Sequence, residues 1–112
     1  MCGIIGITSS KPVSSAIINS LRKLEYRGYD SAGIATLSEG AINEVKSEGR
    51  VDNLEKNLAI KGMSGSVGIG HVRWATHGVP NTINAHPHSS KNVSVVHNGI
   101  IENSTILKKY LI

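Results

Sequence analysis

SVGIGHVRW, residues 66–74, is the stretch that decides the fold of this 112-residue chain. Its apolar, β-branched residues predict a strand. The two glycines inside it indicate that another backbone or a ligand comes close to the strand. We therefore predict that residues 66–74 form the central strand of a sheet.

Further strands and helices are predicted on either side of this strand. Further strands are predicted at residues 3–8, 32–37, 41–48 and 93–98. Helical spacing of apolar residues predicts helices at about 13–26, at about 51–58 and from 102 onward. The polar stretch 76–92, with its two prolines, is predicted to be a long loop. The order β-α-β-β-α-β-loop-β-α predicts one domain, with helices packed on a mixed or antiparallel sheet.

Composition narrows the class of protein. The net charge is +4, from 12 Lys and Arg against 8 Asp and Glu, and the basic residues are scattered, so nucleic-acid binding is not favoured. A single cysteine cannot form an internal disulfide. Neither a secretory signal nor an apolar run of the ~20 residues that span a membrane is recognised, so we expect a cytoplasmic protein without a membrane segment.

Cys2 is the first candidate for chemistry. Removal of Met1 would expose an α-amine, whose reference pKa is about 7.7–8.0. Such an amine can take the proton from the thiol of the same residue, so an N-terminal cysteine carries its own base. Gly3 leaves room beside the thiol. Taken by itself, Cys2 fits better as a small buried apolar residue, which is the usual state of a free cysteine.

Residues 73–78, RWATHG, are the second candidate. Arg73 can hold a carboxylate through two parallel hydrogen bonds, and Thr76 and His77 add donors and acceptors beside it. The alternative is an arginine in a surface ion pair with Trp74 in the core. These two interpretations are about equally supported.

Asn98 and Gly99 are the third candidate. An asparagine amide and a glycine N–H can converge on one oxygen, as in the oxyanion holes of acyl transfer. An ordinary Asn-Gly turn is the alternative, and the dipeptide alone favours it. A metal site built from His86, His88 and Cys2 also stays open, although the sequence lacks the usual metal-binding spacings.

Five segments together point to a known family. They are MCGIIG (1–6), LEYRGYDSAG (24–33), GHVRWATHG (70–78), NAHPH (84–88) and VHNGIIEN (96–103). In this order and spacing they resemble the glutaminase domain of class II glutamine amidotransferases, which are N-terminal-nucleophile hydrolases. RGYDSAG and RWATHG point to the hexosamine branch of that family.

The resemblance implies a site for L-glutamine. Cys2 is the nucleophile, Arg27 helps order the N-terminal site, and Asn98 and Gly99 form the oxyanion hole. The substrate-binding residues implied are Arg73 for the α-carboxylate, Trp74 near the route of ammonia, and Thr76 and His77 in the pocket.

The reaction implied hydrolyses glutamine to glutamate and ammonia through a Cys2 thioester, without a metal or an organic cofactor. In the parent enzyme the ammonia serves the synthesis of glucosamine 6-phosphate from fructose 6-phosphate.

The fold implied is an α+β αββα sandwich with a mainly antiparallel sheet. Residues 1–112 would make up the N-terminal half of this glutaminase domain. Half a sandwich leaves one sheet face uncovered, so self-association is expected. A non-catalytic glutamine-binding or assembly fragment stays an alternative, as does a His-rich metal-binding domain.

Overall fold

A computed structural model describes residues 2–61, 63–74, 82–99 and 101–111. The strands are β1 (Gly3–Thr8), β2 (Ser31–Ser38), β3 (Ala41–Glu48), β4 (Val67–Arg73), β5 (His88–Ser90) and β6 (Val93–Val95). The helices are α1 (Ser14–Leu24), the 3-10 helix η1 (Glu25–Arg27), α2 (Val51–Lys61) and α3 (Ser104–Leu111).

The main sheet has the order β1-β4-β2-β3, and every pairing in it is antiparallel. Strand β4 lies between β1 and β2, so the prediction of a strand inside the sheet at residues 66–74 is confirmed. Gly70 faces Ile5 on one neighbour and Ile34 on the other. The α+β class with a mainly antiparallel sheet is also confirmed.

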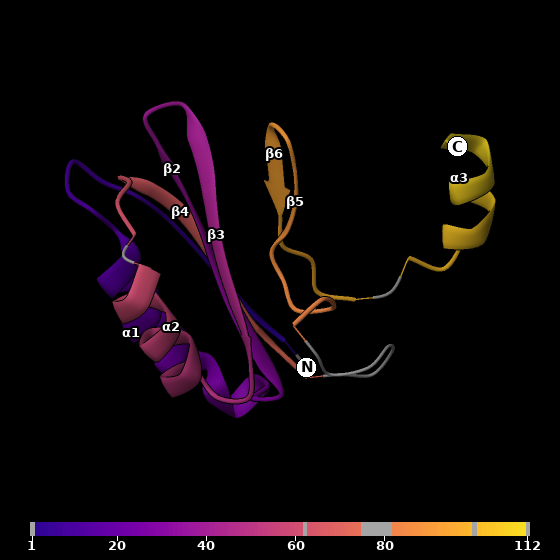
Figure 1. Cartoon of the computed structure of the whole chain (residues 1–112). Coiled ribbons are helices and arrows are strands. Elements are labelled where there is room, and N and C mark those ends of the chain that lie inside the picture. Colours follow the sequence, from indigo (N-terminus) through magenta and orange to yellow (C-terminus); the bar gives the residue numbers. More distant parts are fainter. Residues whose placement is uncertain (1, 62, 75–81, 100, 112) are drawn as a thin grey trace.

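Helices α1 and α2 cover one face of this sheet (Figure 1). Ile17 and Leu21 of α1 and Leu54 of α2 are completely buried there against Ile34. A methyl group at Gly70 would come within 2.6 Å of Cγ2 of Ile17. The glycines of β4 are therefore explained by the close approach of α1, and the close neighbour is another part of this chain.

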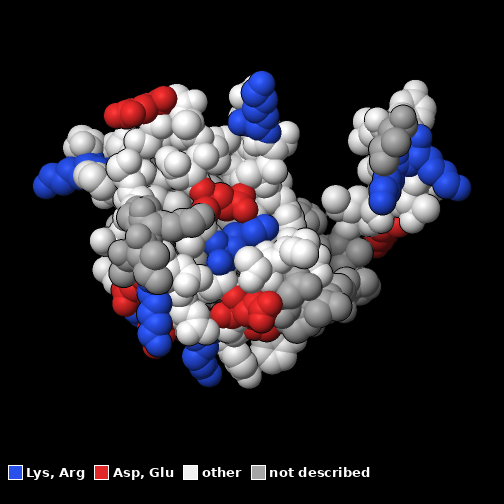
Figure 2. All heavy atoms as spheres, viewed as in Figure 1, with Lys and Arg blue, Asp and Glu red and all other residues white. Residues whose placement is uncertain are grey.

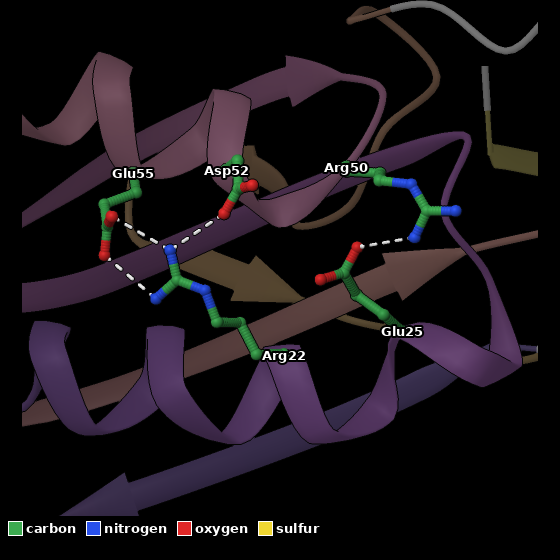
Figure 3. A network of polar contacts seen from close by, with 5 residues as sticks. All are labelled: Arg22, Glu25, Arg50, Asp52 and Glu55. Atoms are coloured by element: carbon green, nitrogen blue, oxygen red, sulfur yellow. Dashed lines mark hydrogen bonds and ion pairs between the residues drawn. The ribbon is translucent and has the colours of Figure 1, made fainter.

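An ion-pair cluster joins the outer surfaces of the two helices (Figure 3). The guanidinium of Arg22 on α1 reaches Asp52 Oδ1 at 3.0 Å and Glu55 Oε1 at 2.9 Å, both on α2. The pKa of Glu55 is lowered, chiefly by its hydrogen bond with Arg22. Because these groups are largely exposed, the cluster contributes little to the stability of the fold.

The opposite face of the sheet, here called the open face, is partly covered by residues 82–98. This segment contains a two-stranded hairpin, β5–β6, which stands apart from the main sheet (Figure 1). The prediction of a continuous loop over 76–92 is wrong at His88–Ser90, which pair with Val93–Val95. The backbone of His86 packs directly on Gly33, where a side chain would collide with it.

Helix α3 lies away from the sheet and buries none of its described side chains (Figure 1). Basic residues are dispersed over the visible face of the molecule and form no single patch there (Figure 2). Within the described ranges, no helix is both long and apolar enough to cross a membrane.

Replacement of Gly70 by alanine should destabilise the fold by about 1–3 kcal/mol, because the added methyl group overpacks the interface with Ile17. Gly6→Ala is the matched control on the open face, where the nearest atom, Cγ2 of Ile69, is 4.0 Å away. Urea unfolding of both variants measures the difference. Equal stability of the two variants would contradict the close packing of α1 on β4.

Candidate functional site

The candidate site lies where β1 begins and β4 ends. Antiparallel pairing sets Gly3 opposite Val72, and this register brings the flanking residues Cys2 and Trp74 together. The backbone N–H of Trp74 donates to Sγ of Cys2 at 3.5 Å. The thiol is half-buried and in no disulfide. Cys2 is thus not the fully buried core residue that its sequence alone favoured.

The backbone carbonyl of Cys2 is held by two side chains from distant parts of the sequence. Nε of Arg27 donates to it at 3.0 Å, and Nδ2 of Asn98 donates to it at 3.2 Å. The candidate nucleophile, the arginine proposed to order it and the candidate oxyanion donor therefore meet at one oxygen atom.

Two glycines allow this convergence. A Cβ at Gly28 would lie 2.5 Å from the carbonyl carbon of Arg73, so the turn after η1 packs directly on the end of β4. A Cβ at Gly3 would lie 2.9 Å from Cβ of Leu24. The buried Gly3 thus brings the start of β1 against the end of α1, a packing role that sequence reasoning had not assigned to it.

Arg73 and Trp74 continue from β4 into the site. Arg73 is buried, while Trp74 is 45% exposed and packs edge-on against Tyr29, with ring centroids 5.6 Å apart. The alternative that placed Trp74 in the core is therefore wrong. Thr76 and His77, the other predicted pocket residues, lie outside the described residues.

His71 is the site residue that sequence reasoning missed. It is completely buried in β4, and its Nε2 lies 2.9 Å from Oδ1 of Asn98 and 3.2 Å from the carbonyl of His97. A histidine inside an apolar strand must find a partner for its ring N–H. That requirement was the available signal.

Three histidine rings are in contact beside the site, with His71 stacked on His86 and His86 edge-on to His88. The rings of His71 and His86 are 4.4 Å apart, and those of His86 and His88 are 4.5 Å apart. Burial, more than the neighbouring cations, lowers the pKa of all three and brings that of His86 to about 4. Within the part of the chain that is described, no group of three or more His, Cys, Asp or Glu could hold a metal ion.

Gly99 follows Asn98 with a φ of 127°, a conformation that glycine adopts without strain. A side chain there would be strained, which explains the glycine independently of any oxyanion role. Its N–H nevertheless comes directly after Asn98, the residue bonded to Cys2. The position is compatible with a second donor at the site.

Comparison with known proteins confirms the resemblance that the motifs indicate. The chain is 56% identical over 111 residues, 99% of its length, to glutamine–fructose-6-phosphate aminotransferase (isomerizing) of Agrobacterium fabrum. It is also 56% identical over 113 residues to the protein of the same name from Clostridium acetobutylicum. The chain spans 18–19% of the length of these relatives. No family model matches it.

Solved structures confirm the expected fold, part of an N-terminal-nucleophile hydrolase sandwich. Glutamine phosphoribosylpyrophosphate amidotransferase from B. subtilis superposes with a TM-score of 0.81 at 28% identity, over 99% of this chain and 24% of that chain. An allosteric regulatory enzyme of purine biosynthesis superposes with a TM-score of 0.83 at 28% identity, over 99% and 25%.

The lowered pKa values of His71, His86 and His88 predict a loss of stability in mild acid. Unfolded histidine has a pKa of about 6.5 and folded His86 one of about 4, so between these values the unfolded chain binds a proton that the folded chain excludes. The free energy of unfolding should therefore fall as the pH falls from about 6.5 to about 4. The slope for one proton is at most about 1.4 kcal/mol per pH unit.

Urea unfolding between pH 7 and pH 4 measures this slope, with His86→Gln as the comparison. The variant should give a shallower dependence, although His71 and His88 still contribute in the same direction. An unchanged slope would show that His86 takes up its proton equally readily in both states.

Proposed function

We propose that this chain carries the nucleophile and oxyanion residues of a glutamine-hydrolysing site. One observation carries the proposal: the amide of Asn98 is bonded to Cys2, a residue 96 positions away, at the tip of the sheet where Trp74 also contacts the thiol. The similarity to amidotransferases supports the choice of glutamine as the substrate.

The reaction requires that Met1 has been removed, because the nitrogen of Cys2 is an amide, and no base, while Met1 is attached. The free α-amine takes the thiol proton, and the thiolate attacks the side-chain amide carbon of glutamine. The C=O electron pair moves onto oxygen. The second N–H of the Asn98 amide, together with the N–H of Gly99, stabilises this oxyanion.

Collapse of the tetrahedral intermediate breaks the C–N bond. The protonated α-amine gives its proton to the leaving nitrogen, ammonia departs, and a γ-glutamyl thioester remains on Cys2. Water, deprotonated by the same amine, then adds to the thioester and releases glutamate and the thiolate. The balance is glutamine plus water to glutamate plus ammonia, with no cofactor required.

The remaining proposed roles concern substrate and product. We assign Arg73 to the α-carboxylate of glutamine, Thr76 and His77 to the pocket wall, and Trp74 to the exit route of ammonia. Arg27 holds the Cys2 carbonyl in place. By analogy with the named relatives, the ammonia would serve glucosamine 6-phosphate synthesis from fructose 6-phosphate.

The chain would form the N-terminal half of a glutaminase domain. The alternative function is a fragment that binds glutamine without hydrolysing it. A cytoplasmic setting suits the mechanism, since reducing conditions there keep the thiol free. The histidines near the site are better explained by stacking and hydrogen bonds than by a metal ion.

The chain without Met1 should release glutamate from glutamine, and Cys2→Ala should abolish this release, because the thioester cannot form. Chain that retains Met1 should be at least tenfold slower, since its Cys2 lacks the free amine. An enzymatic glutamate assay with intact mass of each sample measures both effects. Equal release by Cys2→Ala would exclude Cys2 as the nucleophile, whereas glutamine binding without release would favour the non-catalytic alternative.

We also propose that the chain self-associates through the open face. Ile4, Leu37 and Val67 are 41%, 47% and 43% exposed there, and Leu37 pairs directly with Val67 across β2 and β4. Adjacent exposed apolar residues of this kind favour association. A second copy of this chain, with the same face, is the occupant proposed.

Sedimentation velocity should show a larger species whose fraction grows with concentration. Leu37→Lys should shift the chain toward the monomer by placing a charge on the open face, while Asn19→Lys, on the exposed surface of α1, should not. A concentration-independent monomer for the unsubstituted chain would contradict the proposal.

A further inference from the structure

The ring of His71 has a defined hydrogen position. Its Nε2 faces the carbonyl oxygen of His97, 3.2 Å away, and a carbonyl can only accept. Nε2 must therefore carry the hydrogen. Nδ1 is buried without a hydrogen-bond partner among the described residues, which fits the lone-pair side of a neutral ring. Burial lowers the pKa of His71 and keeps the ring in this neutral form.

This ring fixes the orientation of the Asn98 amide. The single Nε2–H is shared between the carbonyl of His97 and the nearer Asn98 atom at 2.9 Å, which must therefore be the acceptor Oδ1. The amide nitrogen then points to the other side, where it donates to the carbonyl of Cys2 at 3.2 Å. Two independent carbonyls, those of His97 and Cys2, thus require the same amide orientation.

The surroundings of His71 hold the ring rigidly. His71 is completely buried in the middle of the sheet, opposite Gly33 on β2 and Ile4 on β1. The ring of His86 stacks on it at 4.4 Å, and the His86 backbone rests on Gly33. Asn98, by contrast, is exposed and follows the short strand β6. The rigid partner in the pair is His71.

We propose that neutral His71 is a positioning residue, which donates from Nε2 to Asn98 and thereby aims the Asn98 N–H groups at Cys2 and at the oxyanion formed beside it. The role rests on the proposed function, because it concerns the oxyanion of that reaction. An amide nitrogen has two hydrogens. One is used by the Cys2 carbonyl, and the other is left for the oxyanion.

Two variants separate this role from simple packing. His71→Gln keeps a donor nitrogen at a similar distance from the backbone, whereas His71→Leu has a similar bulk and no donor. His88→Gln is the matched control, since His88 is exposed and bonds neither Asn98 nor Cys2 in any contact described.

The experiment compares two labels for Cys2 on the full chain without Met1. The thiolate adds to the carbonyl carbon of a chloromethyl ketone analogue of glutamine and forms an oxyanion. The sulfur then bonds the methylene carbon as chloride leaves, and the oxyanion returns to the ketone as the first C–S bond breaks, so the product is a thioether. Iodoacetamide alkylates the thiolate by direct displacement of iodide and forms no oxyanion. His71→Leu should slow the chloromethyl ketone about tenfold or more, less than the ~10²–10³-fold loss on removal of an oxyanion donor. It should leave the iodoacetamide rate unchanged, and His71→Gln should recover most of the loss.

The ring itself is tested by ¹⁵N NMR of the unsubstituted chain, which reports which ring nitrogen is protonated. A neutral His71 protonated at Nε2 is expected, and protonation at Nδ1 alone would overturn the inference, even if His71→Leu fails to fold. The inference would also be overturned if folded His71→Leu were labelled by the ketone as fast as the unsubstituted chain. Equal losses of labelling rate in His71→Leu and His71→Gln would overturn it as well. If the ketone labels the unsubstituted chain no faster than it labels Cys2→Ala, the proposed function itself fails.

Discussion

The hydrogen bonds accepted by the carbonyl oxygen of Cys2 hold the candidate site together. This oxygen accepts hydrogen bonds from Arg27, just after α1, and from Asn98, just after β6. A residue at a chain terminus is ordinarily poorly ordered unless it is tied down. These two bonds, added to the pairing of β1 with β4, hold the thiol in one place relative to the amide that would stabilise its reaction.

Side chains of the central strand β4 alternate between the two faces of the sheet. Gly68 and Gly70 of β4 point to the helices and let α1 pack closely, which stabilises the sheet. His71 and Arg73 alternate to the open face, where residues 82–98 bring the other polar groups. Strand alternation thus directs one set of β4 residues to the helices and the other set to the proposed site.

Much of this could be predicted from sequence, and the failures have identifiable causes. Apolar patterning located the strands of the main sheet and the helices α1 and α2, because each of these elements buries one apolar face, whereas α3 buries none of its described side chains. The β5 strand was missed because the residues His88–Ser90 carry no apolar alternation. The role of His71 was missed because it depends on Asn98, 27 positions away, and no local pattern reports such a contact. For Thr76 and His77 the sequence is still the sole guide, since both lie outside the described residues.

The central claim is that Cys2 forms a covalent intermediate with glutamine. The most direct measurement is mass spectrometry of chain without Met1, quenched in acid during incubation with glutamine and then digested. The peptide that contains Cys2 is expected to gain the mass of one γ-glutamyl group. Glutamate release without any modified Cys2 peptide, under conditions that preserve a synthetic γ-glutamyl thioester, would contradict the central claim.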